Sequence, residues 1–181
     1  MKKLGLVQVY WGNGKGKTTA ALGLIARALG RNLTVCLIQF MKSGIENNAD
    51  FEEPGEIKIL KKIDGFSYKR FGTKKWVIGK PDSEHIKEAK KAVEFTLDAI
   101  SLGKFNLVIV DEILYAIQLG LISEEKVIEI IDAKAKETEL VLTGSHKAYP
   151  KIFEKADMVS EVRKVKHPFD KGIMARKGIE Y

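Results

Sequence analysis

The sequence predicts an α/β fold in which a parallel sheet of five or six strands carries helices on both faces. Short apolar runs that favour strands alternate along the chain with longer segments of helical periodicity. A glycine-rich turn at residues 12–19 joins the first apolar run to the first helical segment, and a later apolar run, residues 107–110, ends in two acids. In folds of this class a ligand lies at the carboxyl ends of the strands.

The composition indicates one globular domain that spans residues 1–181. The chain has 181 residues, of which 45% are hydrophobic and 30% charged, so it can bury a substantial core beneath a well-solvated surface. No apolar run approaches the roughly 18 residues that cross a bilayer. The first apolar run leads directly into the glycine-rich turn, without a signal-peptide cleavage site. We therefore expect a cytoplasmic protein without a membrane partner.

The charge balance points to a polyanionic partner. The net charge is +7 at pH 7, and the lysines are spread along the chain instead of forming a stripe interleaved with aromatic residues. A small polyanionic ligand is therefore favoured over nucleic acid. The single cysteine, Cys36, lies in an apolar run and is expected to be a buried structural thiol. The three histidines show no metal-ligand spacing, so we expect no protein-ligated zinc site.

The first strand, the glycine-rich turn and the first helix form one unit. Residues 4–10 are apolar and favour a strand. After the turn, Leu22, Ile25 and Leu29 recur at helical spacing, and Gly30 is a natural helix stop. A glycine-rich turn between a strand and a helix is the setting that a phosphate-binding loop requires.

The residue types in this turn suit a polyphosphate. Glycines let the backbone approach the anion and turn its N–H groups inward, and the N-terminus of the following helix attracts negative charge. Lys17 adds a full positive charge, and the hydroxyl of Thr18 can bind a magnesium ion. We interpret the turn as a phosphate-binding loop and not as a Gly/Lys-rich surface turn.

The loop is one residue shorter than the common pattern G-x-x-x-x-G-K-[ST]. That pattern requires a glycine where this chain has Trp11, and the first glycine of the turn is Gly12. We expect the shorter loop to hold polyphosphate differently from the loop of a standard NTPase.

The next part of the chain contains one clear strand and a weaker pattern. Residues 33–40 favour a buried strand, and residues 39–44 form either an ordinary loop or a functional one. Beyond them we expect at most a short third strand at residues 57–59. Residues 68–80 mix aromatic side chains with five cations. They either cover a ligand or form a solvated basic loop whose aromatic side chains reach the core.

The second motif is a buried strand that ends in two acids. A helix opens at residues 81–83 and carries an apolar stripe until Gly103 ends it. The apolar run at residues 107–110 then delivers Asp111 and Glu112 to the carboxyl end of the sheet, beside the loop. There either carboxylate can hold magnesium directly or through water.

The remaining elements complete the sheet. Ser123 is expected to cap a helix, with Ile122 and Val127 placed as a hydrophobic staple. Residues 139–144 favour a further strand and turn, and residues 158–165 alternate well enough for a final edge strand. The predicted arrangement is that of a P-loop NTPase-like (RecA-like) domain.

The closing segment, residues 161–181, closely resembles the C-terminal signature of the P-loop corrinoid adenosyltransferases. These are the cob(I)alamin or cob(I)yrinic acid a,c-diamide adenosyltransferases of B12 synthesis and salvage. The chain is also similar to that family in its shortened loop, in residues 39–44, in its two adjacent acids, and in Thr143 and Gly144. The resemblance therefore spans nearly the whole chain.

The resemblance implies a reaction in which the cobalt(I) of a corrinoid attacks the 5′ carbon of ATP and triphosphate leaves. It also implies that ATP binds in a reversed sense relative to ordinary P-loop hydrolases, that the protein is a homodimer, and that a flavin-type reductase is a candidate partner. Cobalt(I) is already a strong nucleophile, so the protein's task would be positioning and charge neutralisation.

The resemblance also implies the site residues. The loop backbone and its two lysines would cradle the triphosphate, and its two threonines would bind magnesium and phosphate. Phe71 and Trp76, at a different spacing from the family's Phe-x-Trp pair, are candidates for displacing the lower ligand of the corrinoid. The candidate binding residues are Gly12, Asn13, Gly14, Lys15, Gly16, Lys17, Thr18, Thr19, Gln39, Lys42, Phe71, Trp76 and His167. The candidate catalytic residues are Lys17, Thr18 and Glu112, and the candidate magnesium ligands are Thr18, Asp111 and Glu112.

Two other classes of function stay open. In an ATPase or phosphotransferase, Asp111 would hold magnesium and Glu112 would activate water or a hydroxyl group. A non-catalytic module would bind ATP and a corrinoid without turning them over. A recombinase-like role on nucleic acid has no DNA-binding motif to support it.

Overall fold

A six-stranded sheet forms the centre of the molecule. The computed structural model describes residues 4–42, 53–75, 77 and 79–180. The strands are β1 (Val7–Trp11), β2 (Val35–Gln39), β3 (Phe66–Arg70), β4 (Leu107–Asp111), β5 (Glu139–Thr143) and β6 (Met158–Glu161). The helices are α1 (Lys17–Leu29), α2 (Gly55–Leu60), α3 (Ser83–Ser101), α4 (Ile113–Gln118), α5 (Glu124–Asp132), α6 (Pro150–Lys155) and the 3₁₀ helix η2 (Pro168–Lys171).

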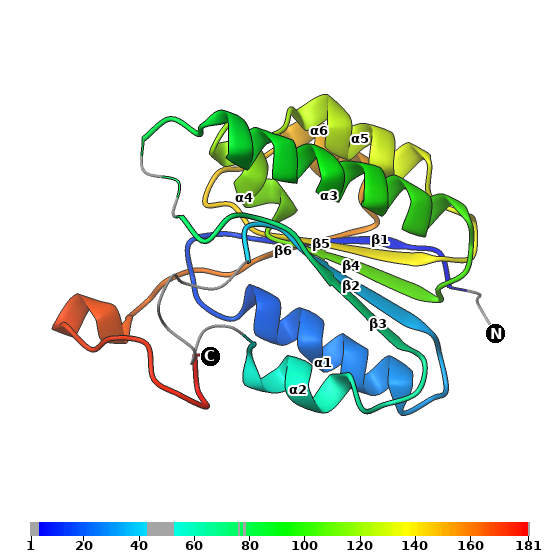
Figure 1. Cartoon of the computed structure of the whole chain (residues 1–181), viewed down its shortest axis with the longest axis horizontal. Helices are drawn as coiled ribbons and strands as arrows, with labels where there is room; N and C mark the ends of the chain where they lie inside the picture. Colours follow the sequence, from blue (N-terminus) through cyan, green and yellow to red (C-terminus); the bar gives the residue numbers. More distant parts are fainter. Residues whose placement is uncertain (1–3, 43–52, 76, 78, 181) are drawn as a thin grey trace.

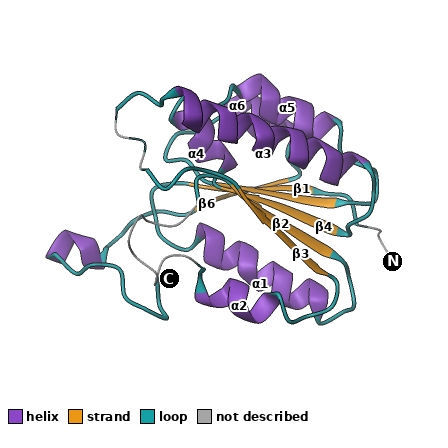
Figure 2. Ribbon diagram, viewed as in Figure 1, coloured by secondary structure: helices purple, strands orange, loops and turns teal. Residues whose placement is uncertain are grey.

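The sheet carries helices on both faces, which confirms the predicted fold class. Its strand order is β3-β2-β4-β5-β1-β6, and every neighbouring pair is parallel. Figure 1 shows α3, α4, α5 and α6 on one face and α1 and α2 on the other. The strands, orange in Figure 2, form the layer between them. The architecture is α/β and P-loop NTPase-like, and all carboxyl ends of the strands meet at one edge.

Three of the four internal strands, β2, β4 and β5, are apolar on both faces because helices cover both. All residues of β2, β4 and β5 are buried, which explains why these strands appear in the sequence as continuous apolar runs. Cys36 packs in the core that includes α3, whereas Val35 and Leu37 pack in the core that includes α1. Burial raises the pKa of the Cys36 thiol to about 12, so this thiol is structural, as predicted.

One predicted strand is a helix. Residues 57–59 lie in α2, where Ile57 and Leu60 are buried and Ile59 is 65% exposed. A strand would place Ile57 and Ile59 on the same face, but the core uses the helical spacing from Ile57 to Leu60. The prediction of a strand at residues 57–59 is therefore wrong.

The third strand is β3, at the start of the segment that mixes aromatic side chains with cations. Phe66 and Tyr68 pack against the core on the side of α1, and Ser67 and Lys69 point to solvent. The burial of β3 alternates along the strand, so only the face on the side of α1 is covered. Polar and charged residues therefore interrupt its apolar pattern.

The predicted helix starts and the predicted edge strand agree with the structure, with one difference. Asp82 accepts hydrogen bonds from the backbone N–H groups of Glu84 and His85 at the start of α3. Ser123 occupies the N-cap position of α5, but its side chain makes no capping hydrogen bond. The final strand, β6, is shorter than predicted and lies at the sheet edge beside β1.

No helix in the described part of the chain combines the length and the apolar character that crossing a membrane requires.

The glycine-rich loop packs against the chain that follows β6. Gly14 N donates to Val162 O at 2.7 Å, and Lys164 N donates to Asn13 Oδ1 at 2.9 Å. Gly12 has a φ of +112°, and a Cβ atom on it would lie 2.4 Å from Val162 O. A Cβ atom on Gly14 would likewise meet backbone within 3 Å. Neighbouring backbone therefore requires glycine at both positions, whatever the loop binds.

We predict that Gly12→Ala lowers the free energy of unfolding by at least about 2 kcal/mol, because it adds backbone strain to a steric overlap. Gly23→Ala is the matched control. Gly23 lies in the interior of α1 with nothing within 4 Å of an added Cβ, so this change should stabilise the protein by roughly 0.5–1 kcal/mol. Urea unfolding of both variants checks the prediction. Equal stability of the two variants would contradict it.

Candidate functional site

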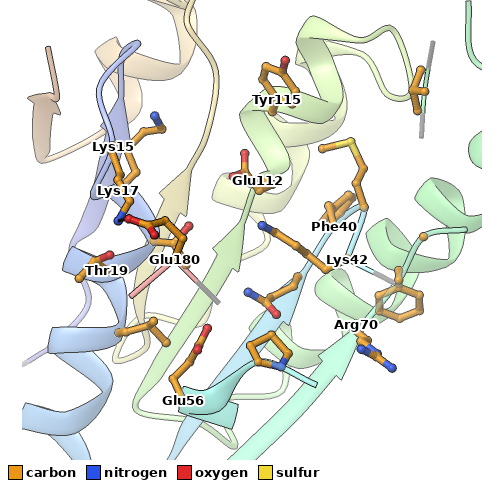
Figure 3. Close-up of a pocket in the computed structure, with 18 of the residues that line it drawn as sticks. Lys15, Lys17, Thr19, Phe40, Lys42, Glu56, Arg70, Glu112, Tyr115 and Glu180 are labelled. Atoms are coloured by element: carbon orange, nitrogen blue, oxygen red, sulfur yellow. Dashed lines mark ion pairs between the residues drawn. The ribbon is translucent and has the colours of Figure 1, made fainter. Parts of the chain in front are cut away.

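A cavity of about 970 Å³ opens at the carboxyl edge of the sheet. It lies between the glycine-rich loop, the ends of β2 and β3, the starts of α2 and α3, helix α4 and residues 178–180. Figure 3 shows Lys15, Lys17 and Thr19 on one side, Phe40 and Arg70 on the other, and Glu112 and Tyr115 between them. The far wall is largely apolar and is formed by Phe40, Met41, Phe71, Val77, Ala89, Leu119 and Leu121. The loop side of the cavity is therefore cationic, whereas the far side combines an apolar wall with the cations Lys42, Arg70, Lys74 and Lys75.

The cationic end is built from the loop and the start of α1. Gly16 precedes the helix with a φ of +118°, and no side chain caps the helix start. Lys17 Nζ donates to Gly12 O at 2.7 Å and to Gly14 O at 2.8 Å, so this side chain lies across the loop. Burial lowers the pKa of Lys17, while the charges of Glu112 and Asp111 oppose this shift. The uncapped helix start and the lysines form a site for an anion.

Beneath the loop, the carboxylate of Asp111 is fully buried. Its Oδ1 accepts hydrogen bonds from Thr18 Oγ1 at 2.9 Å and from Thr143 Oγ1 at 2.6 Å. Its Oδ2 accepts from Gln39 Nε2 at 2.9 Å, and Tyr68 Oη donates to Gln39 Oε1 at 2.8 Å. We call these five residues the Asp111 network. The network joins β4 to α1, β5, β2 and β3 at the floor of the cavity.

Glu112 is placed in the cavity wall by an unusual backbone conformation. It is the residue before α4 and has a φ of +64°, and its N–H donates to Thr143 Oγ1 at 3.0 Å. A Cβ atom on Gly144 would lie 3.2 Å from Glu112 Oε2 and 2.8 Å from Tyr115 N, which explains the glycine there. Burial, and secondarily the charge of Asp111, raise the pKa of Glu112, while Lys42 and Lys17 oppose the shift.

The closing segment returns to the cavity. Residues 178–180 line it, and Glu180 lies 3.7 Å from Lys15 Nζ. Arg176 donates to the Glu180 carboxylate from its backbone N at 2.7 Å and from its guanidinium at 3.1 Å and 3.2 Å. The hydrogen bonds from Arg176, with a smaller contribution from Lys15, lower the pKa of Glu180 to about 2. A carboxylate of the chain itself therefore faces the cationic end.

The structure brings most of the sequence-predicted site residues together. Those that line the cavity are Gly14, Lys15, Gly16, Lys17, Thr18, Thr19, Gln39, Lys42, Phe71 and Glu112. Asp111 lies directly beneath them, in contact with Thr18. Phe71 is also buried against Phe95, with ring centroids 5.8 Å apart.

The other predicted residues have different surroundings. Gly12 and Asn13 face the chain after β6, as described above. His167 lies at the start of η2, away from the cavity, where its Nδ1 accepts a hydrogen bond from Phe169 N at 3.2 Å. Trp76 lies outside the described residues.

Several residues at or near the cavity are not among the predicted site residues, and they include Tyr68, Tyr115 and Glu180. Thr143, which the family resemblance includes, also has a signal of its own, because a polar residue that ends a buried strand indicates the ligand edge of the sheet. The position of Tyr68 beside Gln39 depends on the pairing of β3 with β2. No pattern within β3 itself indicates this position.

The oxygen atoms available at the cationic end fit a magnesium ion that is held partly by the protein and partly by the phosphates of a substrate. In the described part of the chain, no three His, Cys, Asp or Glu side chains form a ready-made metal cluster. Thr18 gives its only proton to Asp111, so its oxygen lone pairs stay available, and Glu112 adds one carboxylate. Magnesium is commonly held by one or two protein oxygens together with substrate phosphates and water.

Comparison with known proteins gives one consistent family. The family model of the ATP:corrinoid adenosyltransferases BtuR/CobO/CobP matches residues 3–181. A corrinoid adenosyltransferase of Pseudomonas aeruginosa is 31% identical over 180 residues, which cover 98% of this chain and 84% of the relative. The corrinoid adenosyltransferase of Escherichia coli K12 is 32% identical over 178 residues, with 98% and 86% covered. The corrinoid adenosyltransferase CobA of Salmonella typhimurium is 32% identical over 179 residues, with the same coverage.

The raised pKa of Glu112 predicts how this residue affects stability. Between the ordinary carboxyl value of 4.5 and the raised pKa, the folded state binds a proton that the unfolded state has lost, so stability falls as pH rises through this window. Glu112→Gln removes the buried charge and should raise the melting temperature at neutral pH. The gain should disappear below pH 4.5.

Thermal unfolding between acid and neutral pH checks this prediction, with Glu94→Gln on the exposed face of α3 as the control. A Glu112→Gln variant that is less stable than the parent at neutral pH would show that the carboxylate stabilises the free protein.

Proposed function

The chain belongs to the ATP:corrinoid adenosyltransferase family, and from that premise we propose how the residues of its cavity perform the reaction. The enzyme transfers the 5′-deoxyadenosyl group of ATP to the cobalt(I) of a corrinoid in cobalamin biosynthesis. The electron pair of cobalt(I) forms the bond from cobalt to C5′. The bond from C5′ to oxygen breaks, and its electrons leave with triphosphate.

The observation that carries the proposal is a single cavity with a cationic end and an apolar wall. In this proposal the uncapped start of α1, Lys15 and Lys17 bind the triphosphate. The apolar wall, including Phe71, receives the corrin macrocycle. Both substrates then occupy one cavity, which is what direct attack of cobalt on C5′ requires. Alignment of these two atoms can contribute up to roughly 7–11 kcal/mol to lowering the barrier.

The second requirement of the reaction is that the negative charge of the leaving triphosphate be neutralised. Thr18 and Glu112 would hold magnesium, which supplies positive charge against the phosphate oxygens. Lys17 precedes Thr18 at the start of α1, and its ammonium group can exchange the carbonyl oxygens of Gly12 and Gly14 for phosphate oxygens. Lys15 can likewise exchange Glu180 for the triphosphate. Positive groups already placed where negative charge develops are effective because they need little reorganisation.

Glu112 also keeps an alternative function open. A half-buried carboxylate with a raised pKa is the group expected of a base that activates water. An ATPase of this kind would release ADP and phosphate, whereas adenosyl transfer releases intact triphosphate. The identity of the phosphate product therefore distinguishes the two readings.

The family resemblance carries further predictions. These are a homodimer, a flavin-type reductase that supplies reduced cobalt, the reversed binding of ATP, and the displacement of the lower corrinoid ligand by Phe71 or Trp76. The resemblance also predicts that Gln39, Lys42 and His167 bind the substrates. The cytoplasmic location is a separate proposal that rests on the sequence pattern and not on the resemblance.

We predict that an anaerobic mixture of the protein with chemically reduced cob(I)alamin, Mg²⁺ and ATP forms light-sensitive adenosylcobalamin and one triphosphate for each cobalt adenosylated. Lys17→Ala should lower kcat/KM at least about 100-fold, the loss typical of one preorganised charge-stabilising group. Its melting temperature should fall only slightly, because the loop keeps the packing of its glycines against residues 162–164 when the two hydrogen bonds from Lys17 are lost. Visible spectra and chromatography of the phosphate products provide the measurement.

The control is Lys126→Ala, which removes an exposed lysine paired with Glu129 on α5 and should leave the rate unchanged. Release of phosphate without a spectral change would favour the ATPase. A folded Lys17→Ala protein with near-parental adenosylation would remove Lys17 from the mechanism.

A further inference from the structure

The Asp111 network has only one consistent assignment of protons. Glu112 N donates to Thr143 Oγ1, so the hydroxyl proton of Thr143 must point to Asp111. Thr18 also gives its single proton to Asp111. Both hydroxyl groups are thereby oriented by a carboxylate that has no solvent exposure.

The second oxygen of Asp111 extends the network through Gln39, which lines the cavity, to Tyr68 on the edge strand. Only the NH₂ group of Gln39 can donate to Asp111 Oδ2, so the amide oxygen must face Tyr68. Gln39 is 2% exposed, and its amide oxygen needs a donor at that depth. Tyr68 supplies one, because burial raises the pKa of Tyr68 to about 12 and the phenol keeps its proton at neutral pH.

Tyr68 itself is held from outside the cavity. Its ring lies 6.5 Å from the ring of Phe66, in a stacked arrangement, and Lys61 Nζ lies 5.4 Å from its centroid. In the sheet, Gln39 of β2 lies opposite Arg70 of β3 on one side and Asp111 of β4 on the other. The chain of hydrogen bonds therefore runs from an edge strand to the hydroxyl of Thr18.

We propose that Tyr68 is a positioning residue for the metal and triphosphate end of the site, acting through Gln39 on the carboxylate of Asp111. This inference rests on the proposed function, because it assumes that Thr18 holds magnesium. Without the Tyr68 hydroxyl, the amide oxygen of Gln39 loses its donor, and the third hydrogen bond to Asp111 loosens. The direction of the Thr18 lone pairs is then less well defined. Outer hydrogen-bond partners orient metal ligands in this way.

The chain contains a matched control in a second relay of the same chemistry. Tyr10 Oη donates to Gln8 Oε1 at 2.8 Å, and Gln8 Nε2 donates to Glu139 Oε1 at 2.7 Å. This relay also joins a tyrosine, a glutamine and a carboxylate. Glu139, however, binds the backbone N–H groups of Gly5 and Leu6 at the amino edge of the sheet, opposite the cavity.

The test compares Tyr68→Phe with Tyr10→Phe in the full-length protein. ATP binding is measured by calorimetry across a magnesium titration, with metal-free ATP as the reference, and the melting temperature is recorded without ligand. Tyr68→Phe should raise the half-saturating Mg²⁺ concentration roughly 3- to 10-fold. This change is modest because Tyr68 acts on the metal ligand through Gln39 and Asp111, whereas losing a direct partner of a metal ligand typically costs about 10-fold or more. The affinity for metal-free ATP should stay close to that of the parent.

Tyr10→Phe should lose a similar amount of thermal stability and keep the magnesium dependence of the parent. Gln39→Met and Gln8→Met repeat the comparison one step closer to each carboxylate, and only Gln39→Met should weaken the response to magnesium.

An unchanged magnesium dependence in Tyr68→Phe, or an equal change in Tyr10→Phe, would overturn the inference while leaving the proposed function intact. A parental protein whose ATP binding does not respond to magnesium at all would instead remove the proposed role of Thr18.

Discussion

The buried carboxylate of Asp111 is the interaction on which the rest of the site depends. A charge without solvent exposure is costly unless hydrogen bonds satisfy it. Here three side chains from α1, β2 and β5 donate to it. These elements must therefore meet around the end of β4, and the strand order places β4 between β2 and β5. The same requirement brings the start of α1, and with it the glycine-rich loop, to the carboxyl edge of the sheet.

The loop is restrained from a second side by the chain after β6. Val162 and Lys164 bond to its backbone and to Asn13, so its shape is set by protein contacts before any ligand binds. This arrangement gives the closing segment a structural role as well as a place in the cavity wall. Preorganisation of this kind suits a reaction in which cobalt(I) needs no activation and the enzyme contributes position and charge.

The sequence predicts the parts of this structure whose patterns are local. β2, β4 and β5 are covered on both faces, so each is a continuous apolar run. The glycine-rich loop, and the adjacent acids Asp111 and Glu112 at the end of β4, are likewise recognised from short stretches of sequence. The prediction at residues 57–59 is wrong because two isoleucines two positions apart fit one face of a strand as well as part of a helical turn. Tyr68 and Glu180 could not be predicted as site residues, because strand register and the return of the closing segment bring them to the site. Both depend on contacts distant in the sequence.

The most direct test of the central claim is to remove the charge of Asp111 while keeping its hydrogen bonds. Asp111→Asn does this, because Gln39 can reverse its amide and the Tyr68 hydroxyl can rotate to accept from it. Calorimetry of ATP binding across a magnesium titration is the measurement. If the buried charge organises the metal end, the variant stays folded and its half-saturating Mg²⁺ concentration rises at least about 10-fold. A folded variant with the magnesium dependence of the parent would contradict the account.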